Sequence, residues 1–171
     1  MSTIEGKRLV TVSVTKALES ASAYAAEDVL SESDTPDAGT AWTFSAIAKV
    51  NGGTGYIEKA QAICETTAIT PRLCLYLFNA TPTSELDDNA ANTALLHADL
   101  SKYVGRIDFP ALSDFGGDSE AVVVPSEYGS LPLAFECASG ADDLYGILVA
   151  RDAFTNTATN DMTIKLTVMQ Y

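Results

Sequence analysis

The chain has 171 residues, enough for one domain with a core of its own and short for two. Its formal net charge of −13, from 23 acidic and 10 basic residues, argues against binding to nucleic acid or to an anionic membrane. No run reaches the roughly 18 apolar residues of a transmembrane helix, and no signal-peptide pattern follows Met1, so we expect the protein to be made and folded in a cytoplasm.

The N-terminal segment is basic, whereas the rest of the chain is acidic. The first 16 residues carry a net charge of +2, from three basic residues and one acidic residue: Lys7, Arg8, Lys16 and Glu5. The remainder of the chain carries a net charge of −15. Residues 8–16 (RLVTVSVTK) alternate valines with mostly polar side chains, and this period of two predicts a half-buried β-strand. The segment is either an ordinary strand with solvated cations or an attachment element spanning residues 1–16.

Short segments rich in β-forming residues follow along the chain. They predict further strands over residues 42–50, 56–64, 72–78, 104–109, 120–124, 131–138, 144–151 and 162–169. The run 72–78 is apolar throughout, which predicts a strand buried on both faces. One short helix is predicted over residues 93–103, with Thr93 as its N-cap and Leu96 and Leu100 four residues apart.

Nine or ten short strands at this spacing predict an all-β protein, an antiparallel β-sandwich with one short helix. Jelly-roll connections are the favoured topology, and other sandwich connections remain open. Neither a linker nor an internal repeat divides the sequence, so we expect a single domain over residues 1–171.

The three cysteines, Cys64, Cys74 and Cys137, lack the close spacing of a zinc or redox site. Each lies in an apolar, strand-like run, which predicts reduced and buried thiols. An alternative pairs Cys64 with Cys74 across a hairpin, because a turn is predicted between them at residues 67–71.

The residue patterns of common catalytic sites are missing from the sequence. His97 is the only histidine and lies in the predicted helix, so a Ser-His-Asp or Cys-His arrangement has a single candidate base. No phosphate-binding GxxxxGK[ST] segment and no set of zinc ligands occurs. The sequence therefore predicts a protein that is not an enzyme and needs no cofactor.

One polar loop has the residue types of a calcium site. Asp87, Asp88 and Asn89, two residues after Glu85, place several oxygen ligands close together, although the spacing and glycine of an EF-hand are missing. The alternative is a solvated loop without a metal.

Several blocks of sequence follow one another in a recognisable order: residues 51–63 (NGGTGYIEKAQAI), 75–80 (LYLFNA), 103–112 (YVGRIDFPAL), 131–138, 144–155 (LYGILVARDAFT) and 164–170. Together, over residues 42–171, they resemble a group of small virion structural proteins of tailed bacteriophages. The resemblance implies a head decoration or cement protein of β-sandwich fold, without catalytic residues, on the exterior of the virion capsid. The implied partner is the major capsid protein.

The sequence thus predicts a capsid-decorating protein that binds and stabilises the shell. The candidate contact residues are Lys7, Arg8, Lys16, Trp42 and Tyr56. We also expect a homo-oligomer, with a trimer matching the three-fold positions of a capsid. The alternative function is a carbohydrate- or receptor-binding module on a head fibre or tail, using exposed aromatic side chains.

If residues 1–16 are an attachment element, deletion of residues 2–16 should abolish capsid binding and leave a folded β-domain.

Overall fold

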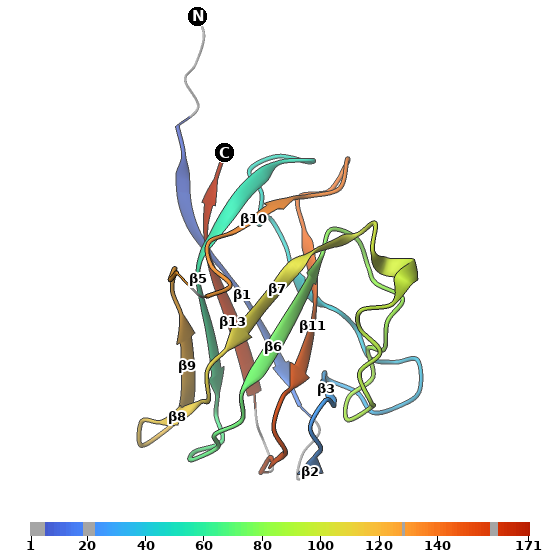
Figure 1. The fold of residues 1–171 in the computed structure, drawn as a ribbon, viewed down its shortest axis with the longest axis vertical. Helices are drawn as coiled ribbons and strands as arrows, with labels where there is room; N and C mark the ends of the chain where they lie inside the picture. The colour runs from blue at the N-terminus through green and yellow to red at the C-terminus, as the bar shows by residue number, and fades with distance from the viewer. Residues whose placement is uncertain (1–5, 19–22, 128, 158–160) are drawn as a thin grey trace, which may run out of the picture.

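The computed structural model describes residues 6–18, 23–127, 129–157 and 161–171, which form two packed antiparallel sheets (Figure 1). The first sheet contains, in spatial order, β1 (Arg8–Ala17), β13 (Asp161–Gln170), β5 (Thr54–Cys64), β9 (Ser119–Val123) and β8 (Ser113–Asp114), with β10 (Leu133–Glu136) also paired to β5. The second sheet contains β3 (Val29–Leu30), β11 (Leu144–Ala150), β6 (Leu73–Phe78) and β7 (Tyr103–Phe109), with β4 (Trp42–Phe44) also paired to β11. A separate small ribbon pairs β2 (Ala23–Tyr24) with β12 (Phe154–Thr155).

The strand order is that of a jelly roll. The eight principal strands in chain order are β1, β4, β5, β6, β7, β9, β11 and β13. Numbered one to eight, they give spatial orders of 1-8-3-6 in the first sheet and 2-7-4-5 in the second. The predicted all-β antiparallel sandwich is therefore confirmed.

Alternation of side chains explains the longest strands. β1 pairs with β13 without a bulge over ten residues, from Arg8 opposite Gln170 to Ala17 opposite Asp161. From Val10 onward in β1 and throughout β13, the even-numbered residues face the core and the odd-numbered ones face outward, while Arg8 at the start of β1 is exposed. β6 is buried at all six positions, as its continuous apolar run predicted.

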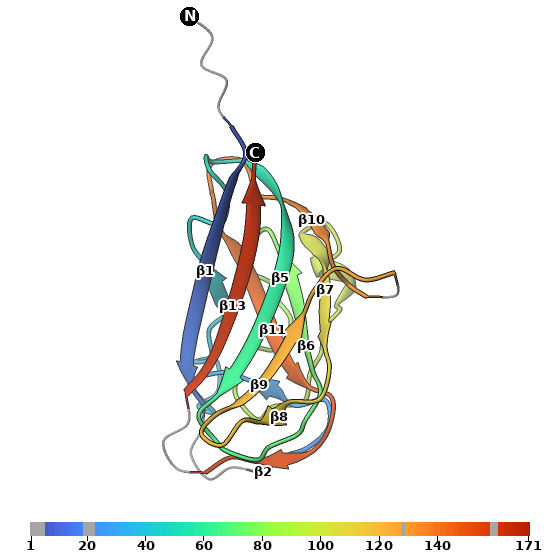
Figure 2. The ribbon, with the colours of Figure 1, turned by 90° about the vertical axis from the view of Figure 1, so that its left-hand side faces the viewer.

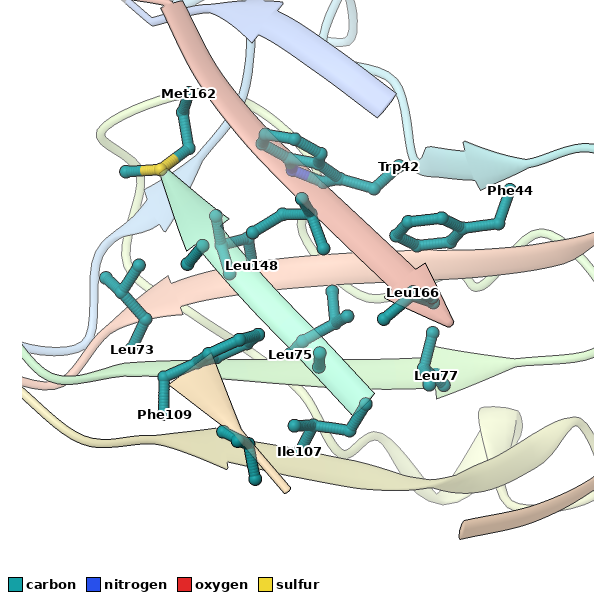
Figure 3. Close-up of a cluster of buried hydrophobic side chains, with 14 of the residues drawn as sticks. Trp42, Phe44, Leu73, Leu75, Leu77, Ile107, Phe109, Leu148, Met162 and Leu166 are labelled. Carbon is teal, nitrogen blue, oxygen red and sulfur yellow. The ribbon is translucent and has the colours of Figure 1, made fainter. Parts of the chain in front are cut away.

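The inner faces of the two sheets meet in one apolar core (Figure 3). Leu75 and Leu77 of β6 lie against β5 and β13 of the other sheet, close to Leu166. Trp42 is 1% exposed, and its indole Nε1 donates a hydrogen bond of 2.8 Å to the carbonyl oxygen of Leu30. This bond satisfies the polar atom of the largest core side chain.

The outer face of the second sheet is covered by the protein's own loops. A second apolar cluster forms there between outward-facing side chains of the sheet and residues of the connection 79–102: Val29, Cys74, Tyr76, Phe78, Ile147 and Val149, with Leu86, Ala94 and Tyr103. Figure 1 shows these loops lying along the side of β11, β6 and β7. β6 and β11 are therefore buried on both faces along almost their whole length, whereas Arg106 and Asp108 of β7 stay exposed.

The predicted helix over residues 93–103 is wrong. Only one 3-10 turn, His97–Asp99, forms there. The Thr93 hydroxyl does not cap a helix, because it accepts a hydrogen bond of 2.8 Å from the backbone N–H of Glu85. Leu96 and Leu100 are 37% and 48% exposed, so their spacing does not mark a buried helix face.

One predicted strand and one predicted cysteine pair differ from what the structure shows. The strand predicted over residues 42–50 ends at Phe44, and the chain turns at Ala46, which has φ +54°. Cys64 and Cys74 lie on different sheets, so the hairpin alternative is wrong. All three cysteines are free and buried, as predicted.

Candidate functional site

Asp87 and Asp88, the predicted calcium ligands, instead tie their loop to the neighbouring segment. Asp88 is buried and accepts hydrogen bonds of 2.8 Å from the Tyr24 hydroxyl and 2.7 Å from the Ser31 N–H. Asp87 accepts 2.8 Å bonds from the backbone N–H groups of two residues, Asp37 and Gly39. These carboxylate oxygens therefore accept hydrogen bonds that join the loop to residues 24–39.

Asn89, the third residue of that group, has φ +58° and donates its backbone N–H to the carbonyl oxygen of Val29 at 2.9 Å. Asn89 is therefore part of the turn that joins this loop to the strand at Val29. Across the described ranges, no three His, Cys, Asp or Glu side chains gather as metal ligands. His97 is exposed on its 3-10 turn.

Two of the candidate capsid-contact residues lie inside the protein. Trp42 belongs to the core, and Lys16 is 8% exposed. The Lys16 ammonium contacts the Glu32 carboxylate, the Thr40 hydroxyl at 2.9 Å and the Ser31 hydroxyl at 3.4 Å. Lys16 is an even-numbered residue of β1 and so faces inward. Neither Lys16 nor Trp42 is therefore the exposed contact residue that we expected.

The other three candidates lie exposed near one end of the sandwich. Lys7 and Arg8 lie at the start of β1, and Tyr56 lies near the start of β5. The Lys7 ammonium lies 4.8 Å from the ring centroid of Tyr171, whose ring meets that of Tyr56 edge-on at 5.8 Å. Tyr171 was not among the capsid-contact candidates, because only the pairing of β13 with β5 brings it beside Tyr56.

A hollow of about 560 Å³, here called the tip groove, opens beside these aromatic side chains. Four aromatic residues line it, together with polar groups of Asn79 and Glu136: Tyr56, Tyr103, Phe135 and Tyr171. Aromatic faces next to amide and carboxylate groups suit a ligand with both apolar and hydroxyl surfaces.

The outer face of the first sheet is uncovered, in contrast to that of the second. Figure 2 looks onto β1, β13, β5 and β9, and no described segment crosses in front of them. We call this surface the open face, made of the outward residues of the four strands: Leu9, Thr11, Ser13, Thr15, Ala17, Thr54, Tyr56, Lys59, Gln61, Ile63, Glu120, Val122, Asp161, Thr163, Lys165, Thr167 and Met169.

The open face is nearly neutral on a protein of net charge −13. Its charged side chains are Lys59, Lys165, Glu120 and Asp161, and Glu58 adjoins them where the ladder between β5 and β13 shifts register, so two cations stand against three acids. Glu120 is also engaged, because it accepts a hydrogen bond of 2.8 Å from the Gln61 amide. Depletion of charge distinguishes the cores of protein interfaces from ordinary surface.

The polar groups of the open face are partly satisfied within it. The hydroxyls of Thr11 and Thr167 lie 3.2 Å apart, and those of Thr15 and Thr163 lie 2.7 Å apart. Hydroxyls that already share a hydrogen bond lose less when a partner displaces water. The apolar side chains Leu9 and Val122 are 60% and 42% exposed, so the face also offers hydrophobic contact.

Neither the family models nor the curated proteins compared with this chain give a match. In the part of the chain that the structure describes, no helix is long and apolar enough to cross a membrane.

Proposed function

We propose that this protein decorates the capsid of a tailed bacteriophage, docking on the outside of the shell through the open face. The observation that carries the proposal is the asymmetry of the sandwich. The outer face of β6 and β11 in the second sheet is covered by the protein's own loops, whereas the first sheet presents a bare, nearly neutral, threonine-rich face. The ordered blocks that resemble virion structural proteins support the shell as the partner.

The size of the open face fits such a role. Four strands about 4.8 Å apart, with ten residues at about 3.3 Å each, give roughly 600 Å² in projection. Side-chain relief raises the accessible area toward the roughly 800 Å² per partner of a standard interface. Many copies on one shell would add avidity if neighbouring subunits also touch. The acidic charge elsewhere is compatible with an exterior position, away from packaged DNA.

The test is to mix the purified protein with expanded capsids of its own phage and to measure co-sedimentation and copy number. We expect saturable binding of hundreds of copies per shell. Binding of a few copies, or none, would overturn decoration and place the protein at a vertex, a fibre or the tail.

The proposal includes a homo-oligomer, with a trimer as the state that matches capsid three-fold positions. Light scattering at micromolar concentration should then give three times the chain mass. A stable monomer under these conditions would contradict the trimer. Capsid decoration would then still be tested by the co-sedimentation assay.

The tip groove favours a second candidate function, a carbohydrate-binding module on a head fibre or tail. Sugar rings stack on aromatic faces such as Tyr171, and their hydroxyls bond to groups such as Asn79 and Glu136. A glycan array, probed with the wild type and Tyr171→Ala, tests this candidate. Hits that disappear in the variant support it, and an array without hits contradicts it.

A further inference from the structure

One edge of β1 has no strand beside it. β1 ends the strand order of the first sheet, and within the described ranges only β13 pairs with it. The direction of the backbone groups follows from β13. The Tyr171 N–H donates to Thr54 and the Asp161 carbonyl oxygen accepts from Glu65, so the odd-numbered residues of β13 point their backbone groups toward β5.

The even-numbered residues of β13 therefore bond to β1, and their partners there are also even-numbered. It follows that Leu9, Thr11, Ser13 and Thr15 direct their N–H and C=O groups away from the sheet. Such a row of unpaired groups is a template for another strand.

The two halves of this edge differ in how they are protected. Near the C-terminal end of β1, Lys16 faces inward and its ammonium reaches Ser31, Glu32 and Thr40. An inward-pointing charge is a common device that protects an edge. The half from Arg8 to Ser13 has no proline, no bulge and no inward charge.

A hollow of about 500 Å³, here called the edge groove, lies along that unprotected half. β1 forms one wall through residues 8 and 10–13, and residues 45, 46, 48 and 49 of the neighbouring turn contribute the other. The charged side chains of the lining are Arg8, Lys49 and Asp142, two cations and one acid. The Gln170 amide fixes this turn by donating to the carbonyl oxygens of Ala46 at 3.1 Å and Ile47 at 2.9 Å. A groove held in place before binding loses less entropy when it is filled.

We propose that the edge groove receives an extended, acidic segment of a partner protein, which adds to β1 as a further strand. The added backbone would pair with Leu9, Thr11 and Ser13, and acidic side chains would lie near Arg8, which lines the groove, and Lys7, the residue before it in the chain. Main-chain bonds supply affinity in this mode of recognition, and side chains supply specificity.

Charge complementarity favours this occupant over a second copy of the chain. A second copy would bring its own basic β1 into the groove, and two bodies of net charge −13 would approach each other. In the capsid setting the segment belongs to the shell protein, and this one identification rests on the proposed function.

Hydrogen exchange tests the edge with the protein as it exists. The probe is a blocked peptide, Glu-Val-Thr-Val-Thr-Val-Glu, with its Lys-ended counterpart as the charge control. Without peptide, the amides of Leu9, Thr11 and Ser13 should exchange much faster than those of Val10 and Val12. Saturating acidic peptide should slow the three outward amides by at least about tenfold. Unchanged exchange, or equal protection by the Lys-ended peptide, would overturn the proposal.

A proline variant separates backbone pairing from other contacts. Thr11→Pro removes an outward N–H without removing a bond to β13, and Thr11→Ala is its matched control because both lose the Thr167 contact. The proline variant should bind the acidic peptide at least about tenfold more weakly than the alanine variant. If the proline variant does not fold, N-methylation of alternate peptide residues removes backbone N–H donors from the peptide instead of from β1. Methylated peptides that bind as tightly as the unmethylated one would contradict strand addition.

The capsid assay distinguishes this proposal from the proposed function. If the wild type and Thr11→Pro bind capsids equally, strand addition to the shell is overturned and decoration stands. If the wild type does not bind capsids but the peptide protects the outward amides, decoration fails and the edge site stands. If the wild type self-associates and Thr11→Pro does not, the groove binds a second copy of the chain. That result would overturn the proposal that it receives an acidic segment of a partner protein.

Discussion

Asp99 is a fully buried carboxylate whose oxygens accept hydrogen bonds of 2.8–3.0 Å from the N–H and hydroxyl groups of Thr83 and Ser84. Burial alone would raise the pKa of Asp99, but these bonds outweigh it and lower the pKa to about 2. The Lys102 ammonium lies 3.5 Å away. Asp99 thereby holds the start of the long connection 79–102 that covers the second sheet.

We expect Asp99→Asn to lower the free energy of unfolding at pH 7 by on the order of 2 kcal/mol, because the amide places an N–H group among donors. A folded pKa below the ordinary value means that the stabilisation is present above about pH 4 and is lost as the pH falls from about 4 to about 2. Urea unfolding at pH 7 and pH 3 measures both effects.

Asp108→Asn is the control for this substitution, because Asp108 is half exposed and pairs with Arg106 on the surface. Its change in unfolding free energy should stay within about 0.5 kcal/mol. Equal effects of the two substitutions would contradict the role given to Asp99.

The three thiols give a second prediction for single residues. Burial raises the pKa of Cys74 to about 12 and that of Cys137 to about 11, and it also raises the pKa of Cys64. A thiol reagent at pH 8 should therefore find no reactive cysteine in the native protein and three in urea. Rapid labelling of any native thiol would show that the core opens more easily than this packing implies.

Sequence patterns could identify inward and outward residues only where the alternation was complete. In β1 the valines predicted a half-buried strand, but Lys16 shares their inward face and its burial depends on Glu32 and Thr40, which lie far along the chain. Trp42 and Tyr56 both lie in strands, and only the pairing of the sheets buries one and exposes the other.

At the scale of elements, β1 is a full strand of the sandwich and not a detachable arm. It makes a ten-residue ladder with β13, and its inward side chains Val10, Val12 and Val14 pack against the core. The expectation that the domain survives deletion of residues 2–16 is therefore reversed by the structure.

We now expect deletion of residues 2–16 to abolish cooperative folding, because it exposes the β13 edge and the core beneath it. Deletion of residues 2–5 retains all of β1 and should unfold at nearly the wild-type temperature. Circular dichroism during heating measures both. A cooperative transition of the longer deletion within a few degrees of the wild type would show that β1 is dispensable.

The strands were predictable from the sequence because each carries its own signal, but the connections were not. Residues 93–103 resemble a helix through two leucines four apart, yet only the turn His97–Asp99 is helical and Asp99 bonds to the distant residues Thr83 and Ser84. Similarly, the acidic loop at Asp87 and Asp88 has the composition of a cation site. Its oxygens are used by backbone groups that no local pattern could indicate.

At the scale of the whole molecule, the two sheets differ in how far their outer faces are covered. The second sheet is covered by the protein's own loops, and the first keeps its open face. Net charge alone predicted an exterior that repels phosphate, but it could not show that the acids largely avoid one face. Which face is bare depends on where the 79–102 connection folds, and that became evident only with the strand order.

The most direct test of the central claim is capsid binding by two variants that each add one negative charge. Val122→Glu places it on the open face, and Ser101→Glu places it on an exposed residue of the loops over the other sheet. Both should unfold like the wild type to within about 0.5 kcal/mol. We predict that Val122→Glu binds expanded capsids at least about tenfold more weakly while Ser101→Glu binds like the wild type. Wild-type binding by Val122→Glu, or loss of binding in Ser101→Glu alone, would contradict docking through the open face.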